Sequence, residues 1–105
     1  MRRLPDRYTS FIHDYPAVGE AYQALGGAVS ECGPLDKRTQ RLVKLSACIA
    51  AGLEGGTHSA VRKALDAGCK PEELRHCALM TLTTIGFPAM MKGFSWVEDV
   101  LSDAE

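Results

Sequence analysis

The residues of this sequence best suited to proton transfer are His58 and Glu54, which lie four positions apart. An imidazole has an unperturbed pKa of about 6.5, so it exchanges protons readily near neutral pH, and a carboxylate is able to orient it. We interpret the two as a candidate catalytic pair. Such a pair could hold an imidazolium that gives a proton to a carbanion. The alternative is a histidine that caps or packs near a helix start, with Glu54 as a solvated acid.

The segment around this pair offers features that suit a negatively charged substrate. Three glycines fall between positions 52 and 57, which predicts a turn or a loosened helix entrance with free backbone amides. Arg62 follows His58 by one helical turn and could bind a substrate carboxylate through two hydrogen bonds. The alternative for Arg62 is an ordinary exposed helix arginine.

The four cysteines do not form a recognisable redox or metal motif. Cys32, Cys48, Cys69 and Cys77 are separated by 16, 21 and 8 positions, so no CxxC pair exists. In a reducing compartment they are expected to be small buried hydrophobic residues. His76 is adjacent to Cys77, but neighbouring helical residues point about 100° apart. We therefore predict no metal site, and the sequence gives no evidence for a cofactor.

The spacing of apolar residues predicts an all-α fold class with about five helices. Apolar side chains recur at intervals of three and four, and no strand-like alternation competes with them. Proline and aspartate mark helix starts at Pro16, Asp36 and Pro71, and Gly68 marks an end. Helices are expected over about 17–30, from 36 to about 52, through 61–68, from 71 to about 85, and from about 89 onward.

Length and composition indicate one globular domain over residues 1–105. The chain is 46% hydrophobic and 24% charged, and its net charge is -1, which gives no electrostatic support for nucleic-acid binding. Arg2, Arg3 and Arg7 are interpreted as part of a solvated N-terminal tail. No apolar stretch is long enough for a membrane span or a signal peptide, so we expect no membrane association and a cytoplasmic location.

Three consecutive segments of the sequence resemble the carboxymuconolactone decarboxylase and alkylhydroperoxidase D superfamily over about residues 20–97. They are GPLDKRTQRLVKLSACIAAG, VRKALDAGCKPEELRHCAL and TIGFPAMM, and the order of KALDAG, KPEEL and GFPA is their most specific feature. The resemblance implies a compact domain built around a helical hairpin and assembly into homo-oligomers such as trimers or hexamers. It also implies that the loop at Phe87 and Pro88 borders the active-site region, which makes both candidate substrate-binding residues together with Arg62.

The resemblance does not extend to the catalytic residues of the peroxidase branch. Counting back without gaps from VRKALDAG places the family's two cysteines on Leu53 and Gly56, its histidine on Ala60 and its glutamate on Arg41. None of the four residues matches. The peroxidase reaction needs two neighbouring sulfur atoms that can form a reversible disulfide. A thiol peroxidase or peroxiredoxin-type antioxidant is therefore the least expected function.

The decarboxylase branch lacks the cysteines and keeps a glutamate four residues before the histidine, the spacing of Glu54 and His58. The match requires two residues to be inserted between His58 and RKAL. On a continuous helix, two residues correspond to a rotation of about 200°, so His58 would face nearly opposite to the family's histidine. A helix that starts later, after the glycines, would remove this difference. The leading hypothesis is a homo-oligomer with a cysteine-independent site for decarboxylation or lactone turnover of a small carboxylated compound. The alternative is a non-catalytic oligomeric binding or scaffold protein of the same family.

Overall fold

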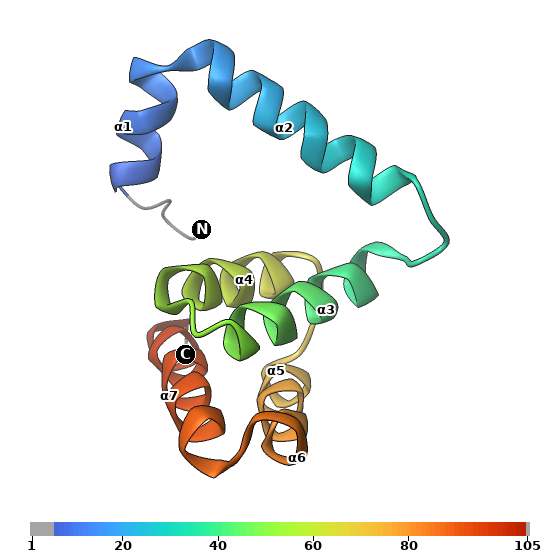
Figure 1. Cartoon of the computed structure of the whole chain (residues 1–105), viewed down its shortest axis with the longest axis vertical. Helices are drawn as coiled ribbons and strands as arrows, with labels where there is room; N and C mark the ends of the chain where they lie inside the picture. The colour runs from blue at the N-terminus through green and yellow to red at the C-terminus, as the bar shows by residue number, and fades with distance from the viewer. Residues whose placement is uncertain (1–5, 105) are drawn as a thin grey trace. The chain divides into compact units, whose positions relative to one another are not determined.

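A computed structural model describes residues 6–104 of the chain, and the side chains of residues 7–103 (Figure 1). Every regular element in this part is a helix, which confirms the predicted all-α class. The helices are α1 (Asp6–Asp14), α2 (Pro16–Glu31), α3 (Lys37–Ala50), α4 (Glu54–Asp66), α5 (Pro71–Met80), α6 (Leu82–Ile85) and α7 (Phe87–Ala104). Five of them correspond to the predicted helices. Helix α1 is additional, and the helix predicted from 71 to about 85 is divided near Thr81 into α5 and the short α6.

The chain divides into two compact units at the boundary between Leu35 and Asp36. The first unit contains α1 and α2, and the second contains α3 to α7. The expectation of a single domain over residues 1–105 therefore stays a prediction.

The first unit is a pair of helices that meet at Gly19. Gly19 of α2 has no side chain, and a Cβ atom placed on it would lie 3.3 Å from Cγ1 of Ile12 in α1. The rings of Phe11 and Tyr15 also lie 5.3 Å apart. Arg7, which we expected in a solvated tail, is instead an exposed residue of α1, because nine residues suffice for a short helix once α2 gives it a surface to pack on. Arg2 and Arg3 lie outside the described residues.

The second unit begins with a hairpin of α3 and α4. Asp36 caps α3, because its side chain accepts a hydrogen bond of 2.8 Å from the backbone N–H of Thr39. Gly52 adopts a φ of 72° and ends α3 before the chain turns into α4. Figure 1 shows the two helices side by side and running in opposite directions.

Helices α5 and α7 complete the second unit by packing against this hairpin. Gly68, at a φ of 96°, follows α4 as predicted, and Pro71 occupies the first turn of α5. The core combines apolar side chains from α3, α4, α5 and α7, among them Leu45, Ile49, Val61, Ala64, Leu74, Ala78, Val97 and Leu101. Within the described residues, no helix is both long and apolar enough to cross a membrane.

Candidate functional site

Helix α4 carries His58 and is regular from its first turn. The backbone N–H of Thr57 donates to the carbonyl of Leu53 over 2.9 Å, so Gly55 and Gly56 lie inside the helix. The loosened entrance that the three glycines predicted is thus confined to the turn around Gly52. His58 therefore projects from the second turn of a continuous helix.

The His58 imidazole contacts Asp99 of α7. Its Nε2 atom lies 3.1 Å from Oδ2 of Asp99, and the two side chains are 22% and 59% exposed. A carboxylate only accepts hydrogen bonds, so Nε2 of the imidazole carries the proton in this contact. The second ring nitrogen, Nδ1, then has the lone pair that could take up a proton from another molecule. Sequence reasoning missed Asp99, because no local spacing indicates a partner 41 positions away.

Glu54, the predicted partner of His58, is exposed at the first position of α4. Among the described residues, no hydrogen bond joins its carboxylate to the His58 ring. Arg62 is half-buried on the same helix, and no described hydrogen bond or ion pair connects its guanidinium to another residue between positions 7 and 103. Phe87 and Pro88 are exposed and form the first two positions of α7, not a loop. The structure thus gives His58 a carboxylate partner, but from a different helix than the one expected.

Next to His58, Thr57 is fully buried, and its hydroxyl has no hydrogen-bond partner among the described residues. A buried hydroxyl without a partner destabilises a fold by about 1–3 kcal/mol.

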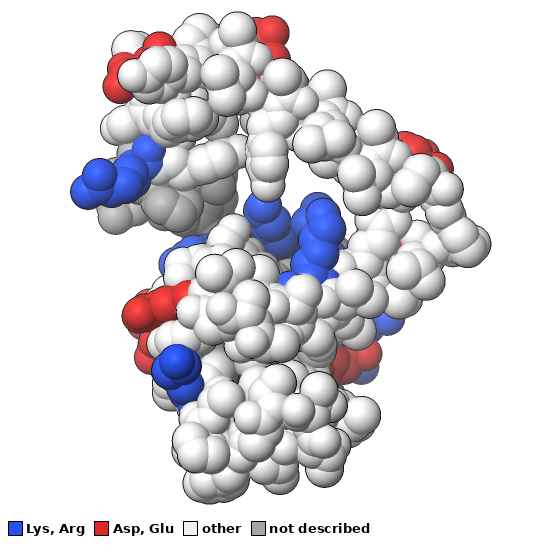
Figure 2. Space-filling view, viewed as in Figure 1, with Lys and Arg blue, Asp and Glu red and all other residues white. Residues whose placement is uncertain are grey.

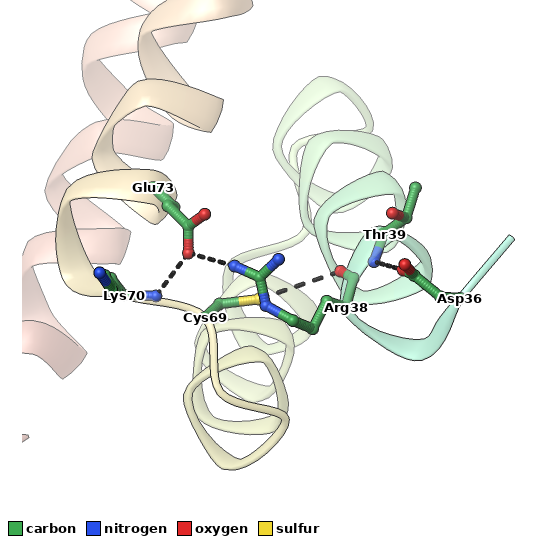
Figure 3. Close-up of polar contacts among 6 residues, drawn as sticks. All are labelled: Asp36, Arg38, Thr39, Cys69, Lys70 and Glu73. Carbon is green, nitrogen blue, oxygen red and sulfur yellow. Dashed lines mark hydrogen bonds and ion pairs between the residues drawn. The ribbon is translucent and has the colours of Figure 1, made fainter.

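A second polar cluster joins the start of α5 to the start of α3 (Figure 3). One carboxylate oxygen of Glu73 accepts hydrogen bonds from the backbone N–H of Lys70 and from the guanidinium of Arg38, at 2.8 and 2.5 Å. The bond from Arg38 and the bond from Lys70 hold the pKa of Glu73 below its ordinary range. Hydrogen bonds from Thr39 lower the pKa of Asp36 in the same way. The residues of this cluster cap two helices and tie them together.

The four cysteines are all free thiols. Cys69 is buried, and burial raises the pKa of its thiol. The Cys77 thiol donates to the carbonyl of Leu42 over 3.3 Å and lies 2.9 Å from Oγ of Ser46. Cys32 differs from the prediction of a buried residue: it caps the C-terminal end of α2 and is exposed.

The sequence model of the carboxymuconolactone decarboxylase family matches residues 16–99. The chain belongs to this family. No curated protein sequence matches the chain. A solved structure similar to it is apo-lpg0406, a carboxymuconolactone decarboxylase family protein from Legionella pneumophila, with 20% sequence identity and a TM-score of 0.79. The similarity covers 94% of this chain and 88% of that one, and it concerns the fold.

Leu53 and Gly56 occupy the positions of the two cysteines of the peroxidase branch when the sequences are compared without gaps. Both positions lie at the start of α4. Leu53 immediately precedes the helix and Gly56 is its third residue. A Cβ atom at Gly56 would lie 3.2 Å from Sγ of Cys48, so the thiol of Cys48 fills the space beside this glycine. Ala60, at the histidine position of that comparison, is buried. The start of α4 therefore holds one thiol and no thiol pair.

Proposed function

We propose that this member of the carboxymuconolactone decarboxylase family performs acid-base chemistry on a small carboxylated compound, with His58 as the catalytic residue and Asp99 as its positioning residue. The observation that carries the proposal is the contact of 3.1 Å between Nε2 of His58 and Oδ2 of Asp99. A carboxylate on Nε2 fixes the tautomer and the ring orientation of an imidazole, and it stabilises the imidazolium that forms when Nδ1 gains a proton.

A decarboxylation at this site would use the imidazolium as the acid. The bond between the substrate's α-carbon and its carboxylate breaks, carbon dioxide leaves, and the bonding electron pair stays on the α-carbon. The proton on Nδ1 of His58 then moves to that carbon, which returns the imidazole to its neutral form. Asp99 keeps its hydrogen bond to Nε2 throughout, so it holds the ring without itself exchanging a proton.

The test is release of carbon dioxide from a panel of small keto acids and carboxylated lactones by wild type and four variants. His58→Ala is expected to slow release by about 10²- to 10⁴-fold, the usual contribution of a general acid. His76→Ala is the matched control, because His76 is an exposed histidine on α5. Equal rates for wild type and His58→Ala on every compound that reacts would remove the proposal, and so would an absence of turnover across the panel.

The same assay decides which carboxylate positions His58. Asp99→Asn is expected to lower kcat with little change in KM, whereas Glu54→Gln is expected to match wild type, because Glu54 has no described hydrogen bond to the ring. A loss in Glu54→Gln with normal turnover in Asp99→Asn would instead favour the pair expected from the sequence spacing.

The second candidate is an oligomeric binding or scaffold function, and a stripe of apolar side chains on α2 supports it. Val18, Tyr22, Leu25 and Val29 recur every three or four residues and are 53 to 66% exposed. Gly19 is the only buried residue between positions 7 and 35. Because a unit of about 35 residues rarely folds without further support, we propose that a second copy of the chain covers this stripe.

Light scattering coupled to size-exclusion chromatography tests this association. Leu25→Glu places a charge in the stripe and is expected to reduce the mass of the particle, whereas Gln23→Glu places the same charge one residue beyond Tyr22, outside the stripe. A wild type that elutes with the mass of a single chain, or equal masses for both variants and wild type, would contradict self-association through α2.

A further inference from the structure

An open groove of about 420 Å³ lies between the start of α3 and the end of α4, within the second unit. Its lining residues are Lys37 and Arg41 from α3, and Lys63, Asp66 and Ala67 from α4. Figure 2 shows lysine and arginine side chains gathered over this hairpin. The volume lies in the lower part of the range of about 300–1,000 Å³ for small-molecule sites. His58 and Asp99 do not line this groove.

The hairpin brings these charges together although they are distant in the sequence. Lys37 and Arg41 are four residues apart on α3, and Lys63 and Asp66 are three residues apart on α4, so each pair shares a helix face. Antiparallel packing sets the start of α3 beside the end of α4. The groove therefore has three cationic side chains and one carboxylate, a formal charge of three minus one, or +2.

Arg41 is the residue that most strongly indicates a ligand. It is half-buried, and no described hydrogen bond or ion pair connects its guanidinium to another residue between positions 7 and 103. Two other arginines of the same unit are paired: Arg38 binds Glu73, and Arg75 binds Glu98 at 2.9 Å. Arg62 also has no described partner, but it does not line the groove. A guanidinium presents a planar set of N–H donors that fits two oxygen atoms of a carboxylate or phosphate.

The geometry points to this groove as a binding site for a small organic anion, whose carboxylate or phosphate oxygens lie between the Arg41 guanidinium and the Lys63 ammonium group. Arginine supplies two parallel hydrogen bonds, and lysine supplies a compact positive charge from the opposite helix. The site stands independently of the acid-base function proposed for His58, because the two sets of residues do not overlap.

Isothermal titration of the full chain with inorganic phosphate and, separately, malonate tests the site. Wild type is expected to bind at least one probe saturably, and raised salt is expected to weaken the binding, because the groove is open to solvent. Arg41→Gln and Lys63→Gln are each expected to weaken it about tenfold or more, the effect of losing one charge-assisted hydrogen bond. Arg41→Lys keeps the charge but loses the planar fork, so its affinity should fall between those of Arg41→Gln and wild type.

Lys44→Gln is the matched control, because Lys44 is an exposed cation on α3 that does not line the groove. It is expected to bind within about twofold of wild type. Tighter binding of phosphate would assign a phosphorylated ligand, and tighter binding of malonate a carboxylated one. The proposal is overturned if neither probe binds at millimolar concentration, or if Lys44→Gln loses as much affinity as Arg41→Gln while circular dichroism shows all variants folded.

Discussion

Gly93 of α7 faces Ile49 of α3 so closely that a Cβ atom at position 93 would lie 2.4 Å from Cγ2 of Ile49. Ile49 is buried and β-branched, so its side chain has little freedom to move away. This contact sets how near α7 approaches the α3 and α4 hairpin, and therefore also where α7 holds Asp99 relative to His58.

Gly93→Ala is expected to lower the free energy of unfolding by about 1–3 kcal/mol, because overpacking a filled core forces a shift of backbone or side chains. Gly55→Ala is the matched control: no atom lies within 4 Å of a Cβ built there, and it is expected to be neutral or to stabilise by up to about 1 kcal/mol. Urea unfolding measures both values. Equal stability of the two variants would show that the approach at Gly93 is looser than described.

Thr57→Val is expected to raise the free energy of unfolding by about 1 kcal/mol, because it replaces a buried hydroxyl that lacks a described partner with a methyl group of similar shape. Thr57→Ser keeps the hydroxyl and loses a methyl group, so it is expected to destabilise. If Thr57→Val is instead less stable than wild type, the hydroxyl has a partner in solution.

Glu73 is expected to make the stability of the second unit sensitive to acid. Its pKa is lowered in the folded chain, chiefly by the hydrogen bond from Arg38, so its contribution is fully present above its ordinary pKa of 4.5. The contribution is lost as the pH falls below 4.5 through the lowered value. Urea titrations should therefore show wild type more stable than Glu73→Gln at pH 7, with the difference shrinking toward pH 3.

Glu72→Gln provides the comparison for Glu73, because Glu72 is the exposed neighbour on the same first turn of α5. At pH 7 it should change the free energy of unfolding less than Glu73→Gln does, because no described hydrogen bond joins the Glu72 carboxylate to Arg38. A difference between wild type and Glu73→Gln that stays constant between pH 7 and pH 3 would mean that the Arg38 contact does not form.

Asp99 is expected to matter more for any reaction than for folding. The contact between His58 and Asp99 is partly exposed, and pairs of this kind typically contribute less than about 1 kcal/mol. A double-mutant cycle of His58→Ala and Asp99→Asn, read by urea unfolding, should give a coupling energy below that value. A coupling of several kcal/mol would identify the pair as a structural clamp between α4 and α7.

The thiols are expected to react with iodoacetamide in the order of their exposure. Cys32 is exposed and should be alkylated first, and Cys69 should be slowest, because it is buried and its raised pKa leaves less of the reactive thiolate. Mass spectrometry of digested samples over time gives the order. Fast reaction of Cys69, or a disulfide formed by peroxide between two cysteines of one chain, would revive the thiol peroxidase interpretation.

The sequence by itself determined most of the helical framework. Proline, aspartate and glycine act on the backbone next to them, so Pro16, Asp36, Gly68 and Pro71 predicted helix ends that the structure confirms. The family was also predictable, because the order of KALDAG, KPEEL and GFPA is preserved along the chain, and the family match confirms it. Helix α1 escaped prediction because so short a helix depends on its contact with α2.

Only the tertiary structure decided which side chains meet. The spacing of Glu54 and His58 placed them on one helix, but the ring of His58 contacts Asp99, which the packing of α7 on α4 brings within 3.1 Å. The groove at Arg41 and Lys63 likewise exists because α3 and α4 run antiparallel. Local sequence sets the backbone conformation of nearby residues, whereas the partners of a polar side chain depend on how distant helices pack. That packing follows from the shared core and from close approaches such as Gly93 on Ile49.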